Sequence, residues 1–156
     1  MKKLIRTDSS NPDFISLVAL LDADLAERDG EETAFYAQFN GISKLRHTVV
    51  LYIDELPVAC GAFKPFKDTL VEIKRMFVLP EYRGKGIASK VLTALELWAV
   101  ELGHVACVLE TGLRQPEAIA LYKKNDYQII PNYPPYEGIE NSVCFKKVLS
   151  TNTSIS

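Results

Sequence analysis

The chain has 156 residues, of which 47% are hydrophobic and 24% are charged, and its formal net charge is −2. This length suits one domain with a sizeable core, and the near-neutral charge gives no sign of a general nucleic-acid partner. No apolar run reaches membrane-spanning length, and the cationic start has no apolar stretch of a signal peptide behind it. Three cysteines without a CxxC pair and two histidines without metal-ligand spacing favour a cytoplasmic protein with reduced core thiols and no metal.

The first half of the chain predicts strands on either side of a helical region. Ser9, Ser10 and Asn11 offer N-caps, and the apolar residues after Pro12 recur at helical spacing. The expected elements are a short edge strand at residues 4–5, helices at 12–29 and 31–39, and strands at 48–53 and 58–63 around a turn at 54–57.

The second half predicts strands that alternate with helices. The expected elements are strands at 70–78, 104–111, 127–130 and 142–148, helices at 87–102 and 116–124, and a disordered polar tail at 150–156. Because a helix connects strand 70–78 to strand 104–111, these two strands should be parallel. A domain over residues 1–149 is therefore expected.

The turn between strand 70–78 and the next helix is rich in glycines and cations. Its sequence RGKGIA, residues 83–88, lies at a helix N-terminus, where uncovered N–H groups and the helix dipole favour phosphate. No Walker loop is present, and the dinucleotide fingerprint fits poorly, because Pro80 intervenes and the third position is Ser89. A plain tight turn with solvated cations remains the alternative.

Two motifs in this half resemble one family. The turn fits (Arg or Gln)-x-x-Gly-x-(Gly or Ala), the pyrophosphate loop of the GNAT superfamily of N-acetyltransferases. The segment QPEAIALYKKNDY, residues 115–127, resembles the same superfamily's Asn-x-x-Ala-x-x-Leu-Tyr…Gly-Phe segment. It departs from that pattern at Gln115, which keeps an amide, and at Asn125-Asp126, where both residues tolerate a left-handed conformation.

The resemblance implies an α/β fold with a mixed, mainly antiparallel sheet of six to seven strands. About four helices would flank the sheet, and its central parallel strands would splay apart. The implied cosubstrate is acetyl-CoA, with no metal. The residues implied to bind it are Met76, Phe77, Val78, Arg83, Gly84, Lys85, Gly86, Ile87, Ala88, Ser89 and Gln115.

Acyl transfer from a thioester to an amine needs a base and a donor to the leaving thiolate. Glu72 and Glu110 each lie in an apolar strand, where desolvation should raise the pKa of a carboxyl group from about 4.3. Each resembles the base of a different GNAT branch, and we favour Glu72 while keeping Glu110 open. Tyr122 occupies the position at which the family protonates, or hydrogen-bonds, the CoA sulfur.

The acceptor is less defined by the sequence. Candidate substrate-binding residues are Tyr36, Arg114, Tyr133 and Tyr136. The expected function is transfer of an acetyl group to a primary amine of a small molecule or amino-acid derivative, in a ternary complex without a membrane or nucleic acid. The alternatives are a protein or peptide acceptor and a non-catalytic CoA-binding regulatory module. The use of larger acyl groups and the oligomeric state stay open, with a homodimer as one option.

Overall fold

The computed structural model describes residues 1–29 and 45–149 of the chain. The elements are β1 (Lys2–Thr7), α1 (Pro12–Asp29), β2 (His47–Ile53), β3 (Leu56–Pro65), β4 (Leu70–Val78), the 3₁₀ helix η2 (Pro80–Tyr82), α3 (Ile87–Glu101), β5 (Ala106–Gly112), α4 (Pro116–Lys124), β6 (Gln128–Ile130) and β7 (Ser142–Val148). Within these residues, seven strands form one sheet in the order β1-β2-β3-β4-β5-β7-β6. The α/β class is confirmed, whereas the helix expected at 31–39 and the tail at 150–156 lie outside the described residues.

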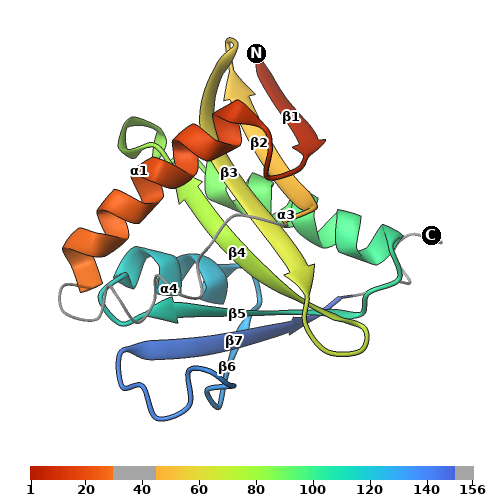
Figure 1. Ribbon diagram of the computed structural model, residues 1–156, viewed down its shortest axis with the longest axis vertical. Coiled ribbons are helices and arrows are strands. Elements are labelled where there is room, and N and C mark those ends of the chain that lie inside the picture. The colour runs from red at the N-terminus through yellow and green to blue at the C-terminus, as the bar shows by residue number, and fades with distance from the viewer. Residues whose placement is uncertain (30–44, 150–156) are drawn as a thin grey trace. The chain divides into compact units, whose positions relative to one another are not determined.

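The sheet is mainly antiparallel, as expected. Antiparallel pairs join β1 to β2, β2 to β3, β5 to β7 and β6 to β7. The neighbouring strands β3 and β4 run in opposite directions (Figure 1). The parallel pair joins Leu70–Glu72 of β4 to Ala106–Val108 of β5, so the predicted parallel arrangement is confirmed.

The chain divides into two compact units. Unit 1 consists of Met1–Lys64 and Ile73–Leu95, and unit 2 of Pro65–Glu72 and Glu96–Ser156. The strand β4 and the helix α3 therefore each contribute residues to both units. A single domain over residues 1–149 stays a prediction.

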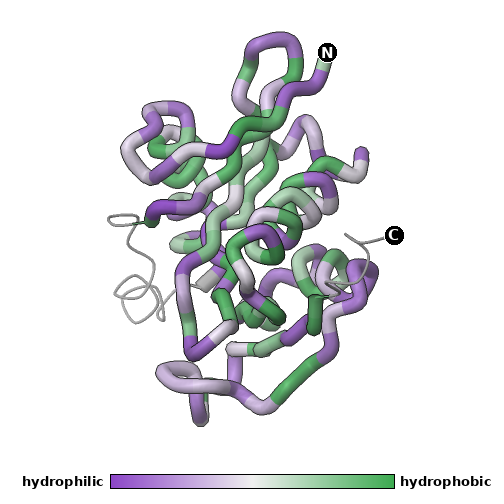
Figure 2. The backbone as a smooth tube through the Cα atoms, turned by 90° about the vertical axis from the view of Figure 1, so that its right-hand side faces the viewer, coloured by the Kyte–Doolittle hydropathy of each residue, from purple (hydrophilic) through white to green (hydrophobic). Residues whose placement is uncertain are grey.

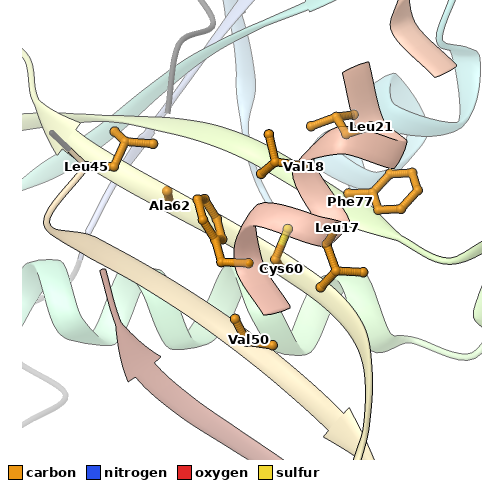
Figure 3. Close-up of a cluster of buried hydrophobic side chains, with 9 residues drawn as sticks. Leu17, Val18, Leu21, Leu45, Val50, Cys60, Ala62 and Phe77 are labelled. Carbon is orange, nitrogen blue, oxygen red and sulfur yellow. The ribbon is translucent and has the colours of Figure 1, made fainter. Parts of the chain in front are cut away.

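Unit 1 has its core between α1 and the strands β2 to β4. The side-chain oxygen of Asn11 accepts hydrogen bonds from the N–H groups of Asp13 (2.9 Å) and Phe14 (3.0 Å), so Asn11 is the N-cap of α1. The apolar side of α1 then packs on small and apolar strand residues (Figure 3). The buried cluster comprises Phe14, Leu17, Val18, Leu21, Leu45, Val50, Cys60, Ala62 and Phe77.

The turn between β2 and β3 is shorter than the sequence predicts. Ile53 pairs with Leu56, so the loop consists of Asp54 and Glu55 alone, with φ angles of 49° and 70°. Two positive φ angles are typical of the primed turn that matches the strand twist. The turn is hydrophilic and is flanked by hydrophobic residues (Figure 2). The prediction of a four-residue turn at 54–57 is therefore wrong, because Leu56 and Pro57 pair with Ile53 and Tyr52 inside β3.

Unit 2 presents two distinct faces of its strands. Glu72 pairs with Val108, and Glu110 pairs with Cys144, so both glutamates lie on one face because side chains alternate along a strand. The opposite face carries Phe145, whose ring lies 5.8 Å from that of Tyr122 in α4. The unit thus separates a carboxylate face from a face packed on α4.

A buried polar group ties the α3 end of unit 2 to its strands. The Tyr127 hydroxyl donates to one oxygen of Glu96 (2.8 Å), and the Lys147 ammonium donates to the other (2.9 Å). Glu96 is buried, and burial of an unpaired carboxylate would cost free energy of desolvation. The two hydrogen bonds offset this cost. None of the helices in the described part of the chain is both long and apolar enough to cross a membrane.

Candidate active site

The turn before α3 leaves backbone amides uncovered. Gly84 and Gly86 both have φ of 78°, and a Cβ added at either would meet no heavy atom within 4 Å. The N–H of Lys90 bonds the carbonyl of Gly86 (3.2 Å), so the amides of Ile87 and Ala88 lie in the first turn of the helix, before any acceptor one turn back. Exposed glycines, open space and helix N-terminal amides together fit a pyrophosphate group.

The two cations of this turn are held beside it. The Arg83 Nε donates to the carbonyl of Val78 (2.9 Å), and its guanidinium carbon lies 5.5 Å from the centre of the Phe77 ring. The Lys85 ammonium lies 5.6 Å from the centre of the Tyr82 ring. Both side chains are exposed, so their charges face solvent where an anion can reach them.

The end of β4 is apolar, and the strand is irregular just before it. Phe77 and Val78 are buried, and Met76 is half-buried. Arg75 has φ of 60°, and its buried guanidinium forms an ion pair with the exposed carboxylate of Asp22 in α1. Within the described residues, the buried Arg75 Nε has no hydrogen-bond partner. The structure therefore places a distorted backbone next to the predicted pantetheine-binding residues.

Glu72, the favoured base, is buried in unit 2 with a tyrosine as its partner. Its side chain is 5% exposed, and the Tyr133 hydroxyl donates to its Oε2 at 2.7 Å. Burial, followed by the negative charge of Glu72, raises the pKa of Tyr133. Tyr133 therefore remains a protonated donor at neutral pH.

Glu110 has a hydroxyl partner of a different kind. The Ser142 Oγ donates to Glu110 Oε2 at 2.8 Å, and Glu110 is half-buried. Ser142 pairs with Gly112, two residues beyond Glu110 on the same face of β5. The two rival bases thus share a face of unit 2, and each carboxylate is held by a hydroxyl group.

The thiol of Cys144 lies on the same face. It is opposite Glu110 in the strand register, and burial, followed by the charges of Glu110 and Glu72, raises its pKa to about 11. Cys60 and Cys107 are also free and buried, and burial raises the pKa of each to about 12. All three thiols stay protonated at neutral pH, which fits the prediction of core cysteines and not of nucleophiles.

Tyr122 is buried on the other face of unit 2. Its ring packs on those of Tyr127 (5.7 Å between centres) and Phe145. Burial, followed by the charge of Glu110, raises the pKa of Tyr122. A protonated phenol is thus present at the residue that the sequence predicts to serve the leaving thiolate.

The loop between β6 and β7 carries the predicted acceptor aromatics. Tyr133 packs edge-on against Phe66 (4.8 Å) and Tyr136 (5.8 Å), and Tyr136 is buried. The side-chain amide of Asn132 donates to three carbonyls of the loop and its exit, those of Tyr136 (3.2 Å), Ile139 (3.3 Å) and Ser142 (3.0 Å). The loop is therefore a packed element and not a loose connection.

The remaining predicted residues of unit 2 lie after β5 and at the two ends of α4. Arg114 is exposed after β5, and Gln115 is the N-cap residue of α4 without a side-chain capping bond. Asp126, with φ of 72°, takes the left-handed conformation, whereas Asn125 does not. Tyr36 lies outside the described residues.

Sequence reasoning missed three partners of the site. Ser142, Asn132 and Phe66 each contact a predicted residue, or hold the loop that carries one. Ser142 begins a strand that the sequence predicts, but the sequence gives no sign of its contact with Glu110 or of Phe66. Across the described ranges, no group of three or more His, Cys, Asp or Glu side chains could hold a metal.

The comparisons with known proteins agree with one another. A profile of the acetyltransferase (GNAT) family matches residues 14–127. The IAA acetyltransferase of Azospirillum brasilense is 39% identical over 80 residues, which are 51% of this chain and 52% of that protein. The chain thus spans about half the length of this relative.

Solved structures show a similar fold. A Klebsiella pneumoniae protein with a provisional assignment as an acyl-CoA N-acyltransferase is 29% identical, with a TM-score of 0.80 over 96% of this chain and 99% of that chain. The N-acetylglutamate synthase of Neisseria gonorrhoeae, complexed with coenzyme A and N-acetyl-glutamate, has a TM-score of 0.70 at 19% identity and covers 96% of this chain and 35% of that chain.

Proposed function

The chain belongs to the GNAT acetyltransferase family, and on that premise we propose that it transfers an acetyl group from acetyl-CoA to a primary amine. The observation that carries this proposal is the open turn at the start of α3, where Gly84 and Gly86 leave space beside uncovered amides. The acceptor that we propose is a small molecule or an amino-acid derivative. The packed aromatic loop of Tyr133 and Tyr136 supports an enclosed acceptor site.

The turn supplies binding for the cosubstrate. Backbone amides of residues 84–88 and the cations of Arg83 and Lys85 bind the pyrophosphate, because several donors and two charges converge on one dianion. The apolar residues Met76, Phe77 and Val78 border the acyl arm, and Gln115 can contribute its amide. What acetyl-CoA supplies is an acyl group activated as a thioester.

The chemistry needs one proton removed and one leaving group stabilised. The amine nitrogen bonds to the acetyl carbonyl carbon, its proton passes to Glu72, and the bond from that carbon to sulfur breaks. Tyr122 donates a hydrogen bond to the departing thiolate. Because its pKa is raised, we favour hydrogen-bond donation by Tyr122 over complete transfer of its proton.

The experiment that tests this function measures thiol release from acetyl-CoA with a panel of amines. We suggest putrescine, kanamycin, glutamate and a peptide with a free N-terminus, each over a range of concentrations. Amine-dependent thiol release with saturation is the expected result, and the best substrate identifies the acceptor class. Tight CoA binding in calorimetry without release for any amine would support the non-catalytic module instead.

A further inference from the structure

One hydrogen bond connects the β6–β7 loop to the proposed base. The Tyr133 hydroxyl donates to Glu72 Oε2 at 2.7 Å, and these residues are 61 positions apart in the chain. Because a carboxylate is planar and rigid, a bond to one oxygen also fixes the direction of the other. The orientation of Glu72 therefore depends on where the loop holds Tyr133.

The loop holds Tyr133 from several sides. Its ring packs edge-on against those of Phe66 and Tyr136, and its hydroxyl is directed to Glu72. The preceding residue, Asn132, closes the loop through its three carbonyl contacts. The hydroxyl thus reaches Glu72 from a pre-organised position, with little conformational freedom left to lose.

In the Tyr133–Glu72 pair, the hydroxyl is the donor and the carboxylate is the acceptor. A hydroxyl that donates to an ionised carboxylate stabilises the ionised form, and such charge-assisted bonds are stronger than neutral ones. The raised pKa of Tyr133 means that it does not lose this proton at neutral pH. The ionised form of Glu72 is also the form that can accept a proton from an amine.

We propose that Tyr133 is a positioning residue, whose hydroxyl orients the Glu72 carboxylate to receive the proton of the acceptor amine. This inference rests on the proposed function, in which Glu72 is the base. It extends that function, because the loop expected only to wall the acceptor site would also prepare the base. Other titratable or charged groups on this face are Glu110 on β5, Cys144 and Lys146 on β7, and Tyr136 in the loop.

Tyr133→Phe removes only the hydroxyl and keeps the ring that packs on Phe66. We expect kcat/KM to fall about 10-fold and the acidic limb of its pH profile to move to higher pH by about one unit, as for the loss of one hydrogen bond to a charged group. The amine used is the best substrate of the panel, at saturating acetyl-CoA. Tyr133→Phe added to Glu72→Gln should change the rate less than 2-fold, because the carboxylate is already absent.

The matched control is Tyr52→Phe. Tyr52 donates to a carboxylate, that of Asp13, at 2.6 Å in unit 1, and neither residue has a place in the proposed chemistry. Tyr52→Phe should leave the pH profile unchanged. If Tyr133→Phe does not fold, Asn132→Ala serves in its place, because it loosens the loop and should shift the limb in the same direction.

The outcomes separate this inference from the proposed function. A limb that stays in place in Tyr133→Phe, or an equal loss in the Glu72→Gln background, overturns the positioning role and leaves the function standing. An acidic limb that persists in Glu72→Gln overturns the base assignment together with the role of Tyr133. A wild-type chain that acetylates no amine overturns both the function and the inference.

Discussion

In unit 1 the candidate cofactor turn consists of exposed backbone, whereas in unit 2 the candidate catalytic groups are buried side chains. Gly84 and Gly86 contribute amides and open space to this turn. Glu72 and Tyr122, in contrast, act through one carboxylate and one phenol, each nearly closed to solvent. The comparison suggests that the turn should be sensitive to bulk and charge, and unit 2 to the loss of single atoms.

The largest effect is expected from Gly86→Asp. The aspartate must adopt a backbone φ near 78°, which is strained for a residue with a side chain. It also places a negative charge where the pyrophosphate binds, so affinity for CoA should fall about 100-fold or more. Isothermal titration calorimetry with CoA measures this. If the folded variant binds CoA as tightly as the wild type, the site at this turn is wrong.

Gly103→Asp is the matched control for that change. Gly103 also has a positive φ (91°) and open space at its Cβ position, but it follows the C-terminus of α3. The backbone strain and the added charge are thus comparable, while the helix N-terminus is untouched. CoA affinity should stay within about 2-fold of the wild type, with a loss of about 1 kcal/mol or more in the free energy of unfolding.

The second largest effect is expected from Tyr122→Phe in unit 2. Removal of the phenol hydroxyl should lower kcat about 100-fold and leave CoA affinity nearly unchanged, because the donor acts on the developing thiolate. Stopped-flow or steady-state thiol release measures kcat where chemistry limits the rate. The control is Tyr127→Phe, because the Tyr127 hydroxyl bonds Glu96 and has no part in the proposed chemistry. This change should lower the free energy of unfolding and leave kcat unchanged. Full kcat in Tyr122→Phe removes this residue from the mechanism.

The third prediction compares the two carboxylates of unit 2. Glu72→Gln should lower kcat/KM by about 10- to 100-fold and abolish its acidic limb, because an amide cannot accept the proton. Glu110→Gln should keep that limb, since Glu110 is held by Ser142 and takes no proton in the proposed chemistry. The reverse pattern would transfer the role of base to Glu110, and a limb that persists in both would report ionisation of the amine itself.

The same contrast explains what the sequence could predict. The bounds of β4, α4 and β7 follow from local patterns, because Pro80 ends one apolar run and Pro116 begins a helix. The turn at the start of α3 is also local, so its residues could be named from their spacing. A site of backbone groups within one short segment can be read from that segment alone.

The catalytic face of unit 2 could be predicted only in part. Glu72, Glu110 and Tyr122 were named from the family resemblance, but their partners are set by the packing of segments far apart in the chain. Ser142 is 32 residues from Glu110, and Tyr133 is 61 from Glu72. No local pattern encodes such contacts. The two-residue β2–β3 turn was missed for a different, local reason, since Asp54 and Glu55 adopt positive φ angles without a glycine.

The smallest effect is expected at the tyrosine–carboxylate pair of unit 1, Tyr52 and Asp13, which lies outside the proposed chemistry. Burial, followed by the hydrogen bond and charge of Asp13, raises the pKa of Tyr52 from 10.0 to about 12. Because the folded state favours the protonated phenol, this stabilisation is fully present below pH 10 and is lost as the pH rises from 10 towards 12. Because Tyr52 is half-exposed, solvent weakens the interaction, and Tyr52→Phe should lower the free energy of unfolding by only about 1 kcal/mol at pH 7.

Urea unfolding at several pH values measures this difference. The gap between Tyr52→Phe and the wild type should narrow above pH 10, because the wild type alone then loses the contribution of its protonated phenol. A gap that does not change between pH 7 and 11 would show that the Tyr52 hydroxyl gains nothing from Asp13. The activity of Tyr52→Phe should stay at the wild-type level throughout the neutral range, because Tyr52 has no part in the proposed chemistry. The same kind of tyrosine–carboxylate hydrogen bond thus stabilises the fold in unit 1 and, in our proposal, orients a base in unit 2.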